Sequence, residues 1–443
     1  MRCHAWVLMV VCGGLPGGIV RAEQALHSGE LTRRPNVLFL LTDDQRADTI
    51  GALGNPVIRT PHLDQLARRG LVFRNAYCLG SNSPAVCLPS RNMLLSGRYY
   101  FRWAGQNYAS GDQPNFPDSL RQVGYETWHV GKLGNTAREI HRRFEHSQYV
   151  EDEQCRTSGE HGQQCVDRAI AFLRSRQTDR PFFMYLALEG PHDPRVAAEH
   201  YLRQYDRARI PVPPSFLPEH PFDNGELAVR DEQLEQWPRT PAAIQRHLHE
   251  YYACITSIDG HIGRLLQTLR ELGEYERTLI VFSADNGLAI GAHGLMGKQN
   301  LYDDGMQVPL ILCGPGIAPG QSDALVYLLD IYPTVCELVG APPPPGIDGR
   351  SLAGVVAGRD AGVRDTLFLA YRDVQRAVRD ARWKLIVYPH CNQSQLFDLQ
   401  TDPWETRNLS SDSAQRERLS QLLQRMRQWQ REVGDTLPLP AQL

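Results

Sequence analysis

The sequence lacks several features that would place it in common functional classes. After the first 22 residues, no stretch is long and apolar enough to form a membrane-spanning helix. The formal net charge is only −3 over 443 residues, so there is no electrostatic reason to expect nucleic acid or an anionic membrane as a partner. Internal repeats and charged tails are absent. With 42% hydrophobic and 22% charged residues, the composition is that of a globular protein with a large core.

Cysteines are present, but their spacing matches no zinc-site pattern. Two of the ten fall in the first 22 residues, which leaves eight. Cys155 and Cys165 flank a polar loop, and they are either a disulfide formed after export or two unpaired thiols. Cys254, Cys313 and Cys336 have apolar neighbours, so we expect them to be small buried hydrophobic residues.

The N-terminal segment has the organisation of a secretory signal. A charged start precedes an apolar run at residues 5–12, and Val20-Arg21-Ala22 supplies a small-residue exit. The apolar run is too short to span a bilayer. We therefore expect residues 1–22 to be a signal peptide and the protein to be secreted or periplasmic, with a lipid anchor at Cys12 or an uncleaved anchor as the less favoured alternatives.

The order of the predicted elements is that of an α/β domain. Residues 36–41 form a continuous apolar run, typical of a parallel strand that is buried on both faces. Further strands are predicted at residues 73–77, 126–130, 182–188, 278–283 and 309–312. Helices are predicted at residues 60–67, 117–123, 165–174 and 244–272. The alternation predicts a large, mostly parallel sheet with helices on both faces.

The pattern changes after four consecutive prolines at residues 342–345, a stiff and non-helical stretch. Three short strands and one polar amphipathic helix are predicted beyond it, at residues 377–378, 383–388, 395–399 and 412–433. We therefore predict an α/β domain at 34–341 and a C-terminal subdomain at 346–443, built from a small antiparallel sheet and a helix. Residues 207–240 are rich in proline and are expected to be a long surface insertion, the kind of segment that often shapes a binding site.

Two pairs of oxygen-donor side chains follow two of the predicted strands. Asp43 and Asp44 come after the first strand, and Asp285 and Asn286 come after the strand at 278–283. Sites in parallel sheets gather at the carboxyl ends of strands, and hard cations such as calcium take six to eight oxygen ligands. Helix capping is the alternative role for such acidic pairs, so these residues alone leave metal binding open.

Cys87-Leu88-Pro89-Ser90-Arg91 is the most specific short motif in the chain. A turn with a helix beginning at Pro89 explains the proline and the serine, but not the whole combination. The pentapeptide resembles the C-x-P-S-R signature of the sulfatase family, in which the cysteine is oxidised to formylglycine.

The resemblance covers about residues 34–410, in the order found in the family. Other segments that resemble family motifs lie at residues 34–44, 60–67, 95–98, 131–132, 181–192, 283–287, 293–298, 383–385 and 396–405. The chain is identified as a member of the formylglycine-dependent sulfatases, which implies the alkaline-phosphatase-like α/β fold.

Family membership also implies a mechanism. The implied ligands of Ca²⁺ are Asp43, Asp44, Asp285, Asn286 and the modified Cys87. The implied catalytic groups are Cys87, Arg91, Lys132, His192 and Lys298. One hydroxyl of the hydrated formylglycine would attack sulfur, calcium and the cations would steady the sulfate oxygens, and His192 would contact the sulfate or protonate the leaving oxygen. The second hydroxyl would then expel sulfate and restore the aldehyde.

One position departs from the family pattern. The family commonly has Gly-Lys-x-His, whereas Gly134 stands here at the histidine position after Gly131-Lys132. Neither His129 nor Asn135 occupies the matching place, although either is a candidate substitute. Loss of a general acid or base costs on the order of a hundredfold or more in rate.

The prediction is a sulfuric ester hydrolase that releases inorganic sulfate from a sulfated substrate. A sulfated carbohydrate suits the secretion signal and the polar insertion, and the activity requires a formylglycine-generating maturation enzyme as a partner. Two alternatives stay open: a phosphatase or phosphodiester hydrolase on the same fold, and a binder of sulfated glycans that lost turnover with the change at Gly134.

Overall fold

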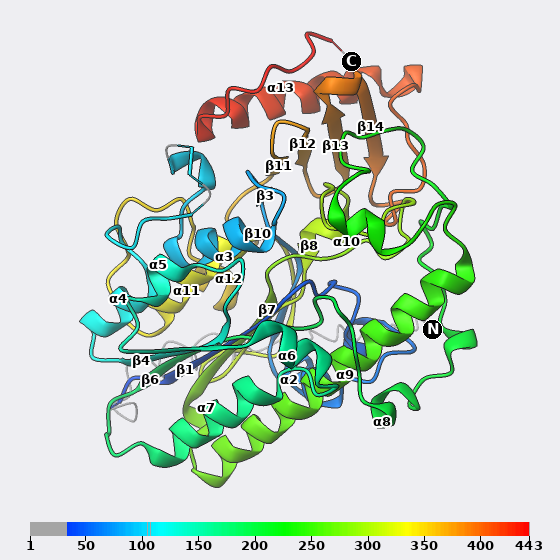
Figure 1. Ribbon diagram of the computed structural model, residues 1–443. Coiled ribbons are helices and arrows are strands. Elements are labelled where there is room, and N and C mark those ends of the chain that lie inside the picture. The colour runs from blue at the N-terminus through cyan, green and yellow to red at the C-terminus, as the bar shows by residue number, and fades with distance from the viewer. Residues whose placement is uncertain (1–32, 104, 107, 443) are drawn as a thin grey trace, which may run out of the picture. The chain divides into compact units, whose positions relative to one another are not determined.

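The computed structural model describes residues 33–103, 105–106 and 108–442, so the predicted signal peptide at 1–22 lies outside the described residues. Residues from Pro35 onward form one compact unit that contains a large sheet between helices and a second, smaller sheet (Figure 1). Across the described ranges, no helix combines the length and the apolar character that crossing a membrane requires.

The large sheet has nine strands in the order β10-β2-β9-β7-β1-β6-β4-β5, with β8 paired to β2. The strands are β1 (Asn36–Thr42), β2 (Leu71–Tyr77), β4 (Glu126–Lys132), β5 (His146–Val150), β6 (Phe182–Ala187), β7 (Thr278–Ala284), β8 (Gln307–Val308), β9 (Leu310–Cys313) and β10 (Gly320–Tyr327). Strands β7, β1, β6, β4 and β5 are mutually parallel neighbours. The predicted α/β fold with a mostly parallel sheet is confirmed.

Strand β9 corrects one detail of the prediction. Residues 309–312 were expected to add another parallel strand, but β9 runs antiparallel to both β7 and β2. Between β7 and β9 the chain forms a loop, the short helix α10 (Asp303–Met306) and the two-residue strand β8. A parallel strand would need a crossover helix that returns the chain to the end of the sheet where β7 begins. This connection contains no such helix, so β9 runs antiparallel alongside β7.

Alternate side chains of β1 point into two separate cores. Val37 and Phe39 pack on one face of the sheet, and Leu38 and Leu40 pack on the other. The helices of the first face are α3 (Cys87–Ser96), α4 (Phe116–Gln122) and α11 (Ile331–Leu338); those of the second are α2 (Pro61–Arg69), α7 (Gln163–Ser175) and α9 (Pro241–Glu271) (Figure 1). Shorter helices are α5 (Arg138–His141), α6 (Asp152–Thr157), α8 (Glu199–Leu202) and α12 (Ala353–Val356). Burial on both faces explains why β1 is a continuous apolar run.

The smaller sheet has the order β14-β13-β12-β11-β3 and is covered by α13 (Figure 1). Its elements are β3 (Gly80–Ser81), β11 (Leu367–Tyr371), β12 (Gln375–Arg379), β13 (Trp383–Tyr388), β14 (Gln393–Asp398) and α13 (Arg416–Val433). Strands β11 to β14 are antiparallel, as predicted, whereas β3 adds in parallel from the segment before Cys87. Gly80 allows this close pairing, because a Cβ there would lie 2.1 Å from the Ala370 carbonyl oxygen. The boundary between 34–341 and 346–443 stays a prediction.

The predicted insertion at residues 207–240 contains only two 3-10 turns, η3 (Arg207–Arg209) and η4 (Arg230–Leu234). It is less superficial than expected, because Asp231, Glu232 and Arg239 are buried. Buried charged side chains need partners, so this segment packs against polar groups of the rest of the fold.

The cysteines behave largely as expected. Cys254, Cys313 and Cys336 are buried, which confirms that prediction. Cys155 and Cys165 are also buried, and both thiols are free. Of the two alternatives for this pair, the structure therefore has the unpaired thiols.

Candidate active site

The strand order brings the predicted site residues to one edge of the large sheet. Thr42 at the end of β1 is level with Ala284 at the end of β7, so the two acidic pairs that follow these strands are neighbours. On the other side of β1, Ala187 of β6 is level with Gly131 of β4, which directly precedes Lys132. Carboxyl ends of parallel strands meet at a common edge, and this edge collects the site.

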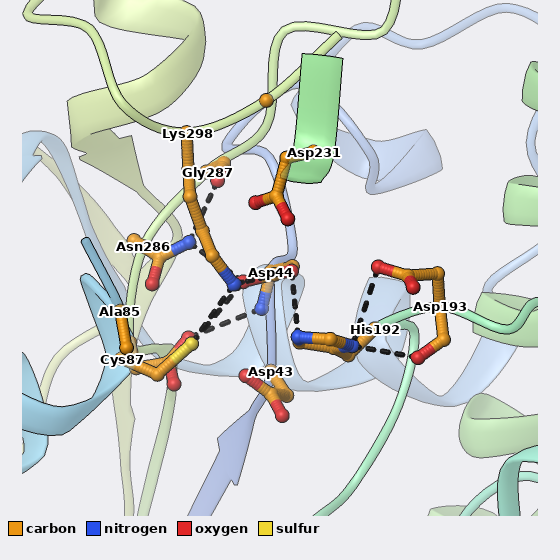
Figure 2. Close-up of polar contacts among 12 residues, drawn as sticks. Asp43, Asp44, Ala85, Cys87, His192, Asp193, Asp231, Asn286, Gly287 and Lys298 are labelled. Carbon is orange, nitrogen blue, oxygen red and sulfur yellow. Dashed lines mark hydrogen bonds and ion pairs between the residues drawn. The ribbon is translucent and has the colours of Figure 1, made fainter. Parts of the chain in front are cut away.

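The two pairs of oxygen-donor residues form a compact buried group, of which Figure 2 shows Asp43, Asp44 and Asn286. Ligand atoms of Asp43, Asp44, Asp285 and Cys87 all lie within 4.8 Å of one another. The backbone N–H of Asp44 donates to Oδ1 of Asp285 at 3.1 Å. Asp44 has φ of 66°, in the left-handed region that aspartate tolerates better than most residues. The turn after β1 therefore ties its two carboxylates to the turn after β7.

Cys87 begins helix α3 beside this group. Nζ of Lys298 donates to Sγ of Cys87 at 3.0 Å, and Sγ donates to Oδ1 of Asp44 at 3.5 Å. The positive end of the helix dipole favours negative charge at this position. Burial and the neighbouring Asp285 raise the pKa of the Cys87 thiol well above its usual range. The unmodified side chain is therefore a neutral thiol in these surroundings.

Three cationic side chains balance the three carboxylates. The pairs are Lys132 with Asp43, Lys298 with Asp44 and Arg91 with Asp285. Nε of Arg91 donates to Oδ2 of Asp285 at 2.7 Å, and Nζ of Lys298 donates to both oxygens of Asp44 at 2.7 and 2.8 Å. A bound divalent cation would thus leave a surplus of two positive charges, which favours an anionic substrate.

His192 lies on the far side of Asp44 from Cys87 (Figure 2). Its Nδ1 donates to the carbonyl oxygen of Asp193 at 2.7 Å, and its Nε2 lies 3.8 Å from Oδ2 of Asp44. Burial and the nearby Lys298 lower the pKa of His192. Burial alone would raise the pKa of Asp193, but His192 and Arg230 bring it down to about 2, so this carboxylate is ionised. The imidazole therefore directs Nε2 toward the carboxylates.

The donor set fits a hard cation. Oδ1 of Asp43 and Oδ1 of Asn286 are buried acceptors without a hydrogen-bond partner. Buried acceptors are costly when unpaired, and a calcium ion takes six to eight such oxygens. Three carboxylates and one amide oxygen donor from two strand ends can supply half or more of that shell, and open positions are left for substrate oxygens.

The residues suggested as substitutes for the missing histidine do not join the site. His129 is fully buried in β4, where its ring lies 3.8 Å from the ring of His141 and its Nδ1 is 2.9 Å from Oγ of Ser147. Asn135 is exposed. Gly134 is held by its N–H, which donates to the Asp152 carboxylate at 2.8 Å. Among the described residues, neither the His129 nor the Asn135 side chain forms a hydrogen bond or ion pair with the carboxylates of the site.

The sequence indicated that the insertion at 207–240 is of the kind that often shapes a binding site, but it did not show which of its residues contact the site. Asp231 accepts from Nε2 of Gln299 at 2.9 Å, next to Lys298, and Arg230 forms an ion pair with Asp193, next to His192. Lysine is rare in this chain, which has 47 lysines and arginines together but only three lysines; all three are buried, and two of them, Lys132 and Lys298, lie in the candidate site. Where arginine is the usual surface cation, a lysine marks a place that needs a compact charge.

Comparison with known proteins agrees with this arrangement. The sequence profile of the sulfatase family matches residues 35–341, and the profile of the N-sulphoglucosamine sulphohydrolase C-terminal region matches residues 291–432. An N-acetylglucosamine-6-O-sulfatase of Bacteroides thetaiotaomicron is 26% identical over 92% of this chain and 88% of its own.

Two solved structures share the fold. One is a protein in complex with its substrate D-glucosamine-2-N,6-O-disulfate; the TM-score is 0.77, with 24% identity over 92% of this chain and 99% of the other. The second is a phosphonate monoester hydrolase from Silicibacter pomeroyi; its TM-score is 0.74, with 24% identity over 90% of this chain and 96% of the other. The family profile spans most of the chain and includes every predicted catalytic residue, so this protein belongs to the sulfatase family, the enzymes that hydrolyse sulfate esters.

Proposed function

We propose that this sulfatase releases inorganic sulfate from a sulfated carbohydrate, using a formylglycine made from Cys87 beside a bound calcium ion. The observation that carries the proposal is the place of Cys87. It stands at the first residue of α3, within hydrogen-bond distance of Lys298 and next to the buried carboxylate group.

The carbohydrate substrate is inferred from the relatives. One relative is named as an N-acetylglucosamine-6-O-sulfatase, one fold neighbour was solved with a doubly sulfated glucosamine, and the C-terminal profile is that of an N-sulphoglucosamine sulphohydrolase. A sulfated amino sugar is therefore the substrate class to test first.

Two groups would be supplied to the chain. Calcium held by Asp43, Asp44, Asp285 and Asn286 would act as a Lewis acid toward the sulfate oxygens. Formylglycine at residue 87, installed by a maturation enzyme, would supply a hydroxyl nucleophile in place of the neutral thiol.

The chain's own residues then have distinct tasks. Arg91 orients Asp285 and neutralises it, and Lys132 does the same for Asp43. Lys298 holds the nucleophile side chain against Asp44 and offers positive charge where the sulfate gains negative charge. His192 directs Nε2 toward the site and would donate a proton to the leaving oxygen.

Export is part of the same proposal. Residues 1–22 have the organisation of a signal peptide, so we infer a secreted or periplasmic enzyme. N-terminal sequencing of the exported protein from its native host should find that the chain starts after residue 22. Exported protein that still carries residues 1–22 would contradict the inference.

The decisive experiment combines mass and activity. Peptide mass analysis of the segment that contains Cys87, from protein made in the native host, should show the loss expected when a thiol is replaced by an aldehyde. The same preparation should release sulfate from 4-nitrophenyl sulfate and from glucosamine 6-sulfate, whereas Cys87→Ala should release none. An unmodified cysteine in active enzyme would refute the formylglycine proposal.

The same assay separates the alternatives. A strong preference for 4-nitrophenyl phosphate or a phosphonate ester over the sulfate would identify a phosphoryl hydrolase on this fold. Binding of sulfated sugars without release of sulfate, by protein with formylglycine in place, would identify a non-catalytic binder.

A further inference from the structure

The insertion touches the site through one turn, η4. Arg230 at its start faces two carboxylates: Nη1 donates to Oδ1 of Asp193 at 3.1 Å and to Oδ1 of Asp231 at 2.9 Å. Nη2 of Arg230 also contacts Oδ2 of Asp193, so both oxygens of that carboxylate are engaged. A two-point guanidinium–carboxylate contact restricts rotation of the carboxylate far more than a single contact does.

Asp193 in turn holds His192. Its carbonyl oxygen accepts from Nδ1 at 2.7 Å, and its Oδ1 lies 3.4 Å from the same nitrogen. Since a carbonyl can only accept, Nδ1 carries a hydrogen, and Nε2 is the nitrogen left to act on the substrate. If the Asp193 side chain were released, its carboxylate could compete with the carbonyl for Nδ1, and the ring would turn.

The turn η4 also forms hydrogen bonds with the loop that carries Lys298. Oδ2 of Asp231 accepts from Nε2 of Gln299 at 2.9 Å, and Oε1 of Gln299 accepts from the backbone N–H of Lys298 at 3.0 Å. The carboxylate of Glu232 accepts from the N–H of Gly297 at 2.8 Å. Three consecutive residues of η4 thus join the loop that carries His192 to the loop that carries Lys298.

We propose that Arg230 is a positioning residue of the sulfatase reaction, which locks Asp193 so that His192 presents Nε2 to the leaving oxygen. The proposal rests on the proposed function, because it requires His192 to act on the leaving group. For this step His192 carries a hydrogen on Nε2 as well as on Nδ1. As the oxygen of the nucleophile bonds to sulfur and the bond from sulfur to the leaving oxygen breaks, the electron pair of the broken bond goes to the leaving oxygen. The proton of Nε2 passes to the same oxygen, and His192 is left as neutral imidazole with Nδ1 still bound to Asp193.

A direct role in substrate binding is the main rival. The Arg230 side chain is 60% exposed, and an exposed cation could attract a second sulfate group of the substrate. However, two carboxylates already neutralise its charge. Binding and positioning also predict different kinetics: loss of a binding contact raises KM, whereas a misplaced proton donor lowers kcat. A misplacement of about 1 Å can cost about a hundredfold.

The test compares leaving groups. We would measure Arg230→Met on 4-nitrophenyl sulfate, whose leaving oxygen needs little protonation, and on phenyl sulfate, whose leaving oxygen needs more. We expect kcat to fall by at least about tenfold on phenyl sulfate and by less than about threefold on 4-nitrophenyl sulfate, with KM nearly unchanged. Arg230→Lys, which keeps the charge but loses the two-point contact, should fall between Arg230→Met and wild type.

The matched control is Arg209→Met. Arg209 lies in the same insertion and pairs with Asp206 at 3.4 Å, but its side chain is 87% exposed. It should show no change on either substrate. In a His192→Gln background, Arg230→Met should add no further preference for the better leaving group, because the donor it positions is already absent.

Several outcomes would overturn the proposal. They are equal losses of kcat on both aryl sulfates, a rise in KM as the main effect, and an added leaving-group preference in the His192→Gln background. If Arg230→Met does not fold, Asp193→Asn carries the same test, with the same expected and contrary results. Failure of wild-type enzyme with formylglycine in place to hydrolyse either ester would instead overturn the proposed function.

Discussion

Replacing Lys298 with methionine tests the candidate site most directly. Its ammonium contacts both carboxylate oxygens of Asp44, at 2.7 and 2.8 Å, and Sγ of Cys87, at 3.0 Å. Methionine keeps much of the length and the apolar stem of lysine but removes the charge. The substitution therefore separates the electrostatic role of residue 298 from its packing.

We expect kcat to fall by about 10²–10³-fold. That is about 2.7–4 kcal/mol of transition-state stabilisation, the usual cost of removing one donor aimed at developing negative charge. The assay is kcat for 4-nitrophenyl sulfate at saturating calcium, expressed per mole of protein that carries formylglycine.

We also expect a loss of stability that calcium reverses. Without the ammonium, the Asp44 carboxylate is buried without its cation, which costs about 3–5 kcal/mol of unfolding free energy. Calcium bound by Asp44 would supply the missing counter-charge. Thermal unfolding of Lys298→Met should therefore return toward the wild-type temperature when calcium is added.

Lys384→Met is the matched control for this experiment. Lys384 is also fully buried, and its Nζ lies 2.6 Å from Oδ1 of Asp303 and 2.7 Å from Oε1 of Glu405. Its loss should destabilise the fold without calcium rescue and with little change in kcat. The reasoning is refuted if Lys298→Met keeps kcat within about threefold of wild type, or if calcium restores both variants equally.

Three further predictions concern metal, the altered motif and pH. Removal of calcium by a chelator should abolish sulfate release, and Asp285→Asn should raise the calcium concentration needed for half activity by at least about tenfold; full activity in chelator would contradict the calcium site. Gly134→His should raise kcat by up to about a hundredfold, because it restores the histidine that the family commonly has at this position; a Cβ there would lie 3.0 Å from Oδ2 of Asp152, so that carboxylate has to shift slightly. An unchanged kcat would show that another group has taken over the task. Burial lowers the pKa of His161 from 6.5 to about 4, so the unfolded chain takes up this proton first and stability is lost as pH falls from about 6.5 toward 4. Between pH 7 and pH 5 this histidine alone should cost about 2 kcal/mol of unfolding free energy, and His161→Gln should flatten the pH dependence of denaturant unfolding by that amount; an equally steep dependence in the variant would contradict the assignment.

Much of the fold followed from local patterns. The apolar runs of β1 and β7 were recognisable because both faces of these strands are buried, and α9 was recognisable from its helical spacing. The edge strand β10 was not predicted, because its first residues, from Gly320, are largely exposed and carry no apolar run. The direction of β9 depends on the path of the loop before it, which periodicity does not encode.

The candidate site, too, was predictable from the sequence only in part. Cys87 to Arg91 form a contiguous motif, and Asp43 and Asp285 each end an apolar strand, so short stretches of sequence were enough to select them. Their meeting in one group requires β1 and β7 to be neighbours, which the parallel sheet supplies.

The contacts that the insertion makes with the site could not be predicted from the sequence alone. Arg230 and Asp193 are 37 residues apart, and Asp231 and Gln299 are 68 apart. The two members of each pair lie in different segments of the chain, so no spacing rule connects them. Local sequence thus selected the candidate nucleophile and the candidate metal ligands, and it carried the family resemblance. The long-range packing of loops decided which charges face one another, because ion pairs between distant segments form only after the sheet has brought those segments together.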